Sequence, residues 1–402
     1  MTITEGRTET GTDIVDRIKV IDCDTHVVEP YDLWTSRVSV EKWGDLVPHV
    51  RWDEKHGKDM WYFGDKAVWH AAGAAMAGFD NYPPNQPKTL AEAQSYTWNA
   101  PERLKIMDEY GIHAAILYPN VSGFGMGRFA SLSDPELMLA CIRAYNDFLT
   151  DFSSIAPDRF IPVSALPFWD VDESVKEMKR CAVMGHRGVV MGSQPEIFGQ
   201  PPIGERYWDK VFAVAQDMDL PINFHIGAGD LNAENYTVQK NSNGKHANYA
   251  KMAVQLFMGN SNAISEVIVS GLCHRFPKLK FVSVESGVGW LPFLLEALDW
   301  QWKNCGVHIE HPEYDLLPSE YFKRQIYGCF WFEHDTVKDT IERIGPDNLL
   351  YESDFPHPTS MAPGPATSAV TPREFIEHRL GDISQVNLEK ILHSNAAKLY
   401  NL

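Results

Sequence analysis

Basic residues are scarce in this sequence relative to acidic ones. The 402 residues include 36 lysines and arginines against 54 aspartates and glutamates, a formal net charge of -18. A chain this acidic repels phosphate backbones and anionic membrane surfaces. We therefore expect neither a nucleic acid nor a membrane as partner, and the sequence favours a small-molecule substrate instead.

Paired cysteines and long apolar runs are also missing. The six cysteines are scattered without a C-x-x-C pair, which in a chain of this length is typical of free thiols in a reducing compartment. No apolar run is long enough to span a bilayer. The polar segment 1–17 has no apolar core of the kind that a secretion signal needs. We expect residues 1–17 to be a flexible leader and the protein to be soluble and cytoplasmic.

Short runs of β-branched and aromatic residues recur along the rest of the chain, separated by stretches with helical spacing. Eight such runs are candidate strands, at 19–24, 114–118, 160–166, 188–191, 221–225, 280–285, 325–329 and 348–352. Strands that alternate with helices form a parallel sheet with crossover helices, and eight is the strand number of a (β/α)8 barrel. The pattern predicts an α/β protein, a TIM barrel in a single domain over residues 18–402.

Two stretches are too long for a minimal barrel. Residues 30–101 follow the first strand and are rich in tryptophan and tyrosine, and residues 227–262 follow the fifth and are rich in glycine, asparagine and alanine. Both leave the carboxyl ends of strands, the face on which barrel active sites form. We interpret them as insertions after strands 1 and 5. Either they cover the site as lids, or the aromatic insertion is a small satellite core packed on the barrel.

The first strand ends in a polar motif, Asp22-Cys23-Asp24-Thr25-His26. Alternate residues of a strand share a face, so Asp24 and His26 should point the same way at the exit of the strand. A carboxylate and an imidazole at a barrel mouth suit a divalent metal ion. The alternative is a polar strand end whose aspartate caps the following helix.

Two later strands end in similar groups. The fifth leads to His225 and a glycine-rich turn, where the backbone can approach a ligand closely. The eighth leads to Asp354, with His357 three residues later. Each motif has a structural alternative, namely a histidine that closes a strand by hydrogen bonding and an Asx turn before a proline. Their joint position at the ends of strands 1, 5 and 8 favours one metal site. The predicted ligands are Asp24, His26, His225 and Asp354.

Further motifs make the sequence similar to a known family. It resembles the amidohydrolase superfamily, in the branch related to aminocarboxymuconate semialdehyde decarboxylase. The resemblance runs from about Ile21 to the C-terminus and rests on the first-strand motif, His225, 271–280, 351–358, 390–392 and 395–396. It implies a barrel with one divalent ion, Zn or Mn, and a homodimer. Where many members have His-x-His, this chain has Asp24 and His26, which resembles members that use manganese or other hard cations. We also expect Asp22 or Glu29 to orient His26.

One position departs from the resemblance. The decarboxylases of this branch have a catalytic histidine at the end of strand 6, and this sequence has Glu285 there. Some of them also use a glutamate three residues later, where this chain has Val288. Three roles stay open for Glu285: a metal ligand, a general base for the metal-activated water, or a structural acceptor for backbone N–H groups. His357 is expected to contact the substrate.

The missing histidine favours hydrolysis over decarboxylation. In the hydrolytic hypothesis, Asp354 accepts the proton of a metal-activated water that attacks a carbonyl of a small organic substrate, while Glu285 and His357 orient the substrate or the water. The alternative is non-oxidative decarboxylation of a small aromatic or unsaturated acid, with Asp354 protonating the ring carbon. An alternative of another class is a metal-free barrel that acts as a binding module.

Overall fold

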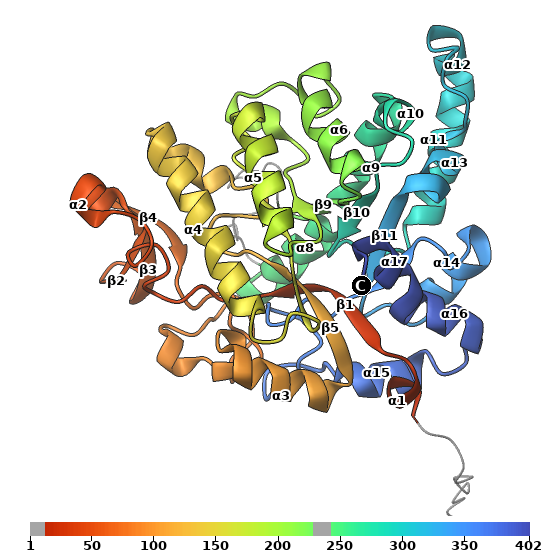
Figure 1. The fold of residues 1–402 in the computed structure, drawn as a ribbon. Coiled ribbons are helices and arrows are strands. Elements are labelled where there is room, and N and C mark those ends of the chain that lie inside the picture. Colours follow the sequence, from red (N-terminus) through yellow and green to blue (C-terminus); the bar gives the residue numbers. More distant parts are fainter. Residues whose placement is uncertain (1–12, 228–242) are drawn as a thin grey trace, which may run out of the picture.

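Short parallel strands form the centre of the molecule, in a computed structural model that describes residues 13–227 and 243–402. The strands run in the order β1-β5-β6 in one sheet and β7-β8-β9-β10-β11-β12 in a second. Their bounds are β1 (Val20–His26), β5 (Ile112–Tyr118), β6 (Phe160–Pro162), β7 (Ser164–Ala165), β8 (Val189–Val190), β9 (Ile222–His225), β10 (Phe281–Val284), β11 (Ile326–Phe330) and β12 (Leu349–Tyr351). Figure 1 shows the helices packed around the outside of these strands.

The two sheets join into one closed barrel. β6 and β7 follow each other with only Val163 between them, and they form one interrupted strand because Pro162 has no N–H to donate. At the other seam Thr25 pairs in parallel with Phe355, and the His26 N–H donates to the Phe355 carbonyl at 2.7 Å. The predicted eight-stranded barrel is therefore confirmed, and each predicted strand overlaps an observed one.

A buried carboxylate fastens this seam. Asp22 is 2% exposed, and its Oδ1 accepts hydrogen bonds from the Ser353 N–H at 2.9 Å and from the Asp24 N–H at 3.2 Å. Its Oδ2 accepts from the Ser353 hydroxyl. These bonds link the first strand to the segment after the last one, so Asp22 stabilises the closed barrel.

Replacing Ser353 with alanine should lower the free energy of unfolding by about 1–3 kcal/mol, because a buried carboxylate oxygen loses its donor. Urea denaturation followed by tryptophan fluorescence measures this change. Ser154→Ala is the matched control, since the Ser154 hydroxyl donates to the Asp151 carbonyl at an exposed position. If the two substitutions lowered the free energy of unfolding equally, the bond from Ser353 to Asp22 would contribute no more to stability than an exposed hydrogen bond.

The helices around the barrel begin at sequence signals and bury one face each. In α4 (Pro135–Ser153), Asp134 accepts hydrogen bonds from the Glu136 and Leu137 N–H groups, and proline stands at the first helical position. The buried face of α4 contains Leu137, Cys141, Ile142, Tyr145 and Leu149, at helical spacing. Other helices that pack around the strands are α3 (Ala100–Tyr110), α5 (Val171–Val183), α6 (Asp209–Asp217), α9 (Asn260–Val269), α11 (Leu291–Asn304) and α14 (Thr336–Ile344). Among the described residues, no helix combines the length and apolar character that crossing a membrane requires.

The segment between β1 and α3 contains an antiparallel sheet that the sequence did not predict. Its strands are β2 (His49–Asp53), β3 (Lys58–Phe63) and β4 (Lys66–His70). Trp34 and Trp61 of this segment are fully buried, pack edge to face at 4.8 Å and belong to the same apolar cluster as the barrel. Trp34 also packs against Phe129, at 5.8 Å. These two tryptophans therefore pack together with the main apolar core of the described residues.

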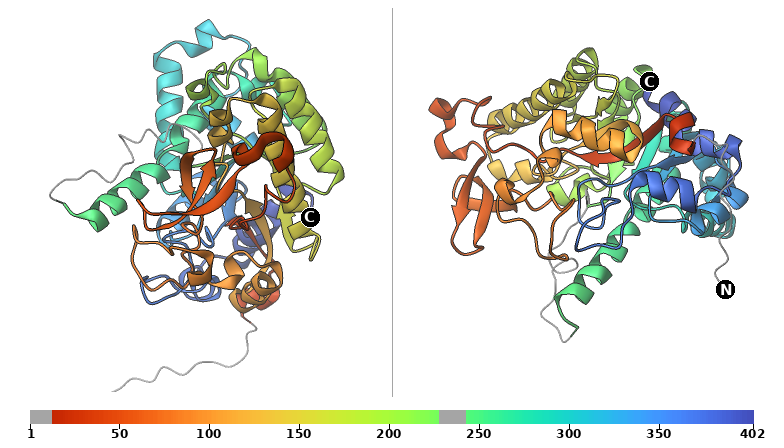
Figure 2. Two further views of the ribbon diagram at one scale, coloured as in Figure 1. Left: turned by 90° about the vertical axis from the view of Figure 1, so that its left-hand side faces the viewer. Right: turned by 90° about the horizontal axis from the view of Figure 1, so that it is seen from below.

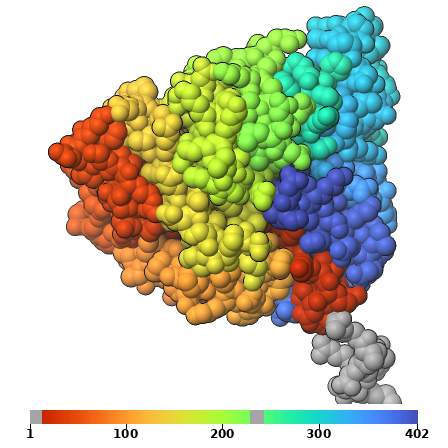
Figure 3. All heavy atoms as spheres, viewed as in Figure 1, coloured from red at the N-terminus to blue at the C-terminus, as the bar shows by residue number. Residues whose placement is uncertain are grey.

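The two ends of the described chain lie together. The last residues of the expected flexible leader instead form a short helix, α1 (Ile14–Arg17), with Ile14 and Val15 buried. The Val15 N–H donates to Glu377 Oε1 at 3.0 Å in α15 (Pro372–Arg379). Figure 3 shows this red N-terminal segment against the blue C-terminal region. Residues 1–12 of the leader and 228–242 of the second insertion lie outside the described residues.

Candidate active site

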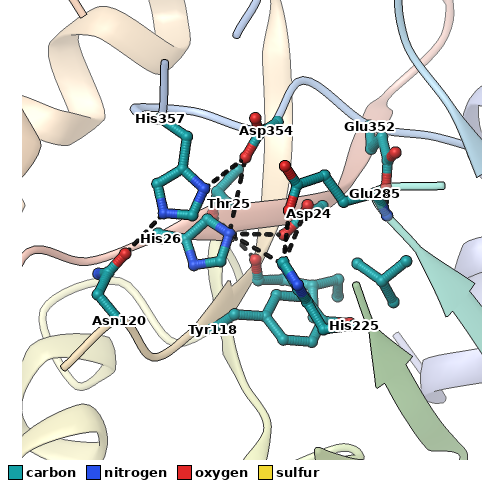
Figure 4. Close-up of polar contacts among 12 residues, drawn as sticks. Asp24, Thr25, His26, Tyr118, Asn120, His225, Glu285, Glu352, Asp354 and His357 are labelled. Carbon is teal, nitrogen blue, oxygen red and sulfur yellow. Dashed lines mark hydrogen bonds and ion pairs between the residues drawn. The ribbon is translucent and has the colours of Figure 1, made fainter. Parts of the chain in front are cut away.

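Four predicted site residues converge at the carboxyl ends of the strands (Figure 4). Asp24 and His26 lie on β1, His225 is the last residue of β9, and Asp354 follows β12. Nε2 of His26 is 3.2 Å from Asp24 Oδ1, and Nε2 of His225 is 3.5 Å from Asp24 Oδ2. Oδ1 of Asp354 lies 3.7 Å from His26 Nε2. The structure thus brings the predicted ligand set together around one point.

The Nε2 atoms of His26 and His225 face each other. Nδ1 of His26 lies 3.1 Å from the Pro119 carbonyl, and Nδ1 of His225 lies 2.8 Å from the Ile226 carbonyl. A carbonyl only accepts hydrogen bonds, so both Nδ1 atoms carry a proton, and in the neutral ring each Nε2 then has a free lone pair. These Nε2 atoms are only 3.1 Å apart. Two lone pairs at this distance require a cation or a proton between them.

Buried carboxylate oxygens surround the same point. Among the described residues, histidine nitrogens approach the two oxygens of Asp24 and Oδ1 of Asp354, and no backbone N–H or hydroxyl donates to them. Burial opposes ionisation of Asp24, but the neighbouring His225 and His26 outweigh it and hold its pKa below the usual range. Burial, together with the charges of Glu285 and Asp24, raises the pKa of Asp354 far above its usual range. Such a set of buried acids and imidazoles fits a divalent cation.

Glu285 faces this set instead of the protein backbone. Its Oε2 lies 3.4 Å from His225 Nε2, and the ligand atoms of Asp24, His26, His225 and Glu285 all lie within 4.8 Å of one another. No backbone N–H in the part of the chain that is described donates to the Glu285 side chain, so the described contacts give no support to the structural-acceptor interpretation. Its pKa is raised to about 8, chiefly by burial. Glu285 is therefore positioned as a further ligand or as a base.

The backbone at both acids is unusual. Glu285 and Asp354 each have a φ of 56°, in the left-handed region that residues other than glycine rarely adopt. Such strain is typical of functional sites, where surrounding contacts maintain it. At Glu285 one such contact is visible: its N–H donates to Glu352 Oε2 at 3.1 Å. At Asp354 the N–H donates to the Asp24 carbonyl at 3.1 Å. Both carboxylates are thereby directed into the site.

His357 covers the site from the side of the last strand. Its ring stacks on His26, with centroids 3.6 Å apart, and its Nδ1 lies 2.8 Å from Asp354 Oδ1. The Asn120 amide group donates to the Val27 carbonyl, so its oxygen faces His357 Nε2 at 2.7 Å and accepts a hydrogen bond from it. With Nε2 protonated, the close approach of Nδ1 to Asp354 requires a shared proton or a cation there.

The expectation that Asp22 or Glu29 orients His26 is wrong. The Asp22 carboxylate is occupied by Ser353 and the Asp24 N–H. Glu29 is buried, and its Oε1 accepts from the N–H groups of Asn120 and Val121. The Pro119 carbonyl orients His26 instead, a role that the sequence does not reveal because any residue can supply a backbone carbonyl.

Comparison with known proteins is consistent with this geometry. Residues 21–402 match the sequence profile of the amidohydrolase family. The chain belongs to the amidohydrolase family. Membership makes this amidohydrolase an enzyme, a metal-dependent hydrolase or carboxy-lyase.

Two curated relatives align with most of this amidohydrolase. Gamma-resorcylate decarboxylase from Rhizobium radiobacter is 25% identical over 313 residues, which cover 75% of this chain and 86% of the relative. The 2-amino-3-carboxymuconate-6-semialdehyde decarboxylase of Dictyostelium discoideum is 22% identical over 322 residues, covering 78% and 80%. The predicted branch of the superfamily is thereby confirmed.

Solved structures share the fold of this amidohydrolase. An amidohydrolase from Mycobacterium avium subsp. paratuberculosis K-10 superposes with a TM-score of 0.74 at 22% identity, covering 96% of this chain and 99% of that one. A 5-carboxyvanillate decarboxylase from Novosphingobium aromaticivorans DSM 12444, complexed with manganese and 4-hydroxy-3-methoxy-5-nitrobenzoic acid, gives 0.64 at 18% identity, covering 96% of each. These matches support the barrel assignment.

Three residues of this site in the amidohydrolase were not predicted. Asn120 follows β5 and contacts His357, Glu352 follows β12 and contacts Glu285, and Phe124 stacks on His225 with ring centroids 3.9 Å apart. Asn120 and Glu352 each stand within two residues of a predicted strand end on the active face. That position could have identified these two residues as part of the site. The sequence gives no such indication for Phe124, because aromatic residues are common in loops.

Proposed function

We propose that this amidohydrolase is a metal-dependent, non-oxidative decarboxylase of a small aromatic acid. The observation that carries the proposal is the pair of His26 and His225 Nε2 atoms, 3.1 Å apart with both Nδ1 atoms committed to carbonyls. The oxygens of Asp24 lie beside them, at 3.2 Å from His26 Nε2 and 3.5 Å from His225 Nε2. This set fits a divalent cation, and its oxygen-rich character suits manganese, which is bound in the Novosphingobium decarboxylase.

Decarboxylation is favoured over the hydrolysis that the sequence suggested. Both curated relatives are decarboxylases, so the comparisons support the alternative and lend no support to the hydrolytic interpretation. The hydrolytic interpretation rested on the missing histidine of strand 6. Glu285, at that position, lies 3.4 Å from His225 Nε2. An acidic group is therefore within reach of the metal site in place of the histidine.

The residues that would hold the ion are Asp24, His26, His225 and Asp354, with Glu285 in reach. A divalent ion held by these residues would supply Lewis-acid chemistry and would orient an acidic substrate at the mouth of the barrel. Asp354 and His357, whose Oδ1 and Nδ1 lie 2.8 Å apart, supply the proton. This proton passes to the ring carbon, the bond to the carboxylate breaks, and CO2 departs. The Asp354–His357 pair then regains a proton from water, while Asn120 keeps the His357 ring in place.

The test uses protein reconstituted with manganese and a set of hydroxylated benzoic acids. We expect release of one CO2 per product and, in D2O, one deuterium on the carbon that carried the carboxylate. Protein stripped with a chelator is the control and should be inactive. Hydrolysis would instead consume amides or lactones, place oxygen-18 from labelled water in the product and release no CO2. That outcome would replace the proposal.

A further inference from the structure

A helix from the second insertion runs from the first insertion to the rim of the barrel mouth. α8 (Lys245–Phe257) projects from the body of the molecule beside the first insertion (Figure 2). At its start, Lys245 Nζ donates to Asn85 Oδ1 at 2.8 Å, and His246 Nδ1 lies 2.7 Å from the Pro83 carbonyl. At its end, the Phe257 carbonyl accepts from the hydroxyl of Ser286, the residue after Glu285. The helix is therefore anchored on both sides of the site.

One face of α8 is turned toward the barrel. Residues 249, 252, 253, 256 and 257 are half-buried, whereas 250, 251, 254 and 255 are exposed. This spacing is that of one helical face. Phe257 on this face packs against Trp331 at 5.0 Å and Phe332 at 5.5 Å. Tyr249 lies two turns earlier on the same face, which places it over the mouth between the two anchors.

Tyr249 lies on the half-buried face of α8 that is turned toward the barrel. In keeping with this position, burial raises its pKa, and the negative charges of Asp354 and Glu285 raise it further. No described residue forms a hydrogen bond with its hydroxyl. A partly buried phenol on the face of α8 turned toward the barrel can donate its proton to a ligand.

We propose that Tyr249 is a specificity-determining residue, whose hydroxyl donates a hydrogen bond to a polar ring substituent of the substrate remote from its carboxylate. The inference rests on the proposed function for the class of substrate. An aromatic acid with its carboxylate at the metal site extends its ring toward the mouth, where α8 lies. A site that hydrogen-bonds a substituent rejects the analogue without it, because the site's own polar group then stays unpaired.

The experiment measures substrate preference in wild type and in Tyr249→Phe, which keeps the ring and removes only the hydroxyl. The probes are 2-hydroxybenzoate and its derivatives with an added hydroxyl or carboxylate at ring positions 4 or 5. Dissociation constants come from isothermal titration with manganese-loaded protein, and kcat/KM from CO2 release. Tyr207→Phe is the matched control, since Tyr207 is an exposed tyrosine of the short helix Arg206–Trp208.

We expect wild type to bind one substituted acid more tightly than the others. Tyr249→Phe should bind that acid roughly tenfold more weakly and the other acids as wild type does. Affinity for 2-hydroxybenzoate and the metal content should not change, and Tyr207→Phe should behave as wild type. A preference that survives in Tyr249→Phe, an equal loss for all acids, or no preference in wild type would overturn the inference. Because titration does not depend on turnover, a protein that binds these acids with a Tyr249-dependent preference but releases no CO2 would refute the decarboxylase proposal alone.

Discussion

Replacing His225 with alanine should leave the purified protein without its metal ion and without measurable turnover. The substitution removes one of two imidazole nitrogens that lie 3.1 Å apart at the centre of the site, together with a neighbour of Asp24. Loss of an outer-shell partner alone typically lowers metal affinity or activity by about 10–100-fold. Loss of a direct ligand should lower metal affinity by more than that. Elemental analysis of protein equilibrated with manganese measures the change.

The control for this substitution is His186→Ala. His186 is also buried, but its Nε2 bonds to the Thr150 hydroxyl at 2.9 Å, and it precedes β8 at the opposite end of the barrel. We expect His186→Ala to lower thermal stability while leaving the metal content unchanged. A full complement of metal in His225→Ala would remove this histidine from the ligand set.

Replacing Asp354 with asparagine should lower turnover by roughly 10²–10⁴-fold, the range typical of losing general acid–base catalysis. Asparagine keeps the size of the side chain and one oxygen that can face a cation, but it has no acidic proton to transfer to the substrate. The close contact of Asp354 Oδ1 with His357 Nδ1, at 2.8 Å, loses its shared proton. Steady-state kinetics and elemental analysis on the same preparation separate the two roles of this residue.

The metal content of Asp354→Asn decides which role dominates. If Asp354 is chiefly the proton donor, the variant should retain its metal through Asp24, His26 and His225 and lose only turnover. If it is chiefly a ligand, metal and turnover should fall together. Asp299→Asn is the control, because Asp299 accepts hydrogen bonds from Ser319 outside the barrel mouth. Wild-type metal and turnover in Asp354→Asn would mean that Asp354 only shapes the loop before Pro356.

The eight barrel strands could be predicted because each is a short apolar run bounded by turn residues, a pattern that burial on both faces imposes. The antiparallel sheet between 49 and 70 was missed because its strands are only partly buried and include exposed positions such as Arg51 and Trp52. Its tryptophans suggested a separate core. Only the fold shows that Trp34 and Trp61 pack into the core of the barrel.

The predicted ligands could be inferred from the sequence because strand exits in a barrel converge on one face. Their mutual distances were not predictable, and neither were the contacts that orient them. Asp22 was expected to orient His26, but β1 has a register irregularity against β5 between Asp22 and Thr25. Asp22 therefore binds Ser353 across the seam. Backbone partners such as the Pro119 carbonyl have no sequence signature at all.

The seam between the first strand and the segment after the last has a consequence for how the protein is made. Asp24 and His26 are synthesised early and Asp354 near the end, and the backbone bonds that join them close a loop that spans most of the chain. Closing so long a loop costs conformational entropy. An ion bound across the seam would offset part of this cost. At an ion concentration 1,000 times the dissociation constant of the ion, binding would stabilise the folded protein by about 4 kcal/mol. A nascent chain on the ribosome cannot assemble this ligand set until residue 354 has emerged. With the proposed ligand set, the metal site is therefore complete only when translation is almost finished.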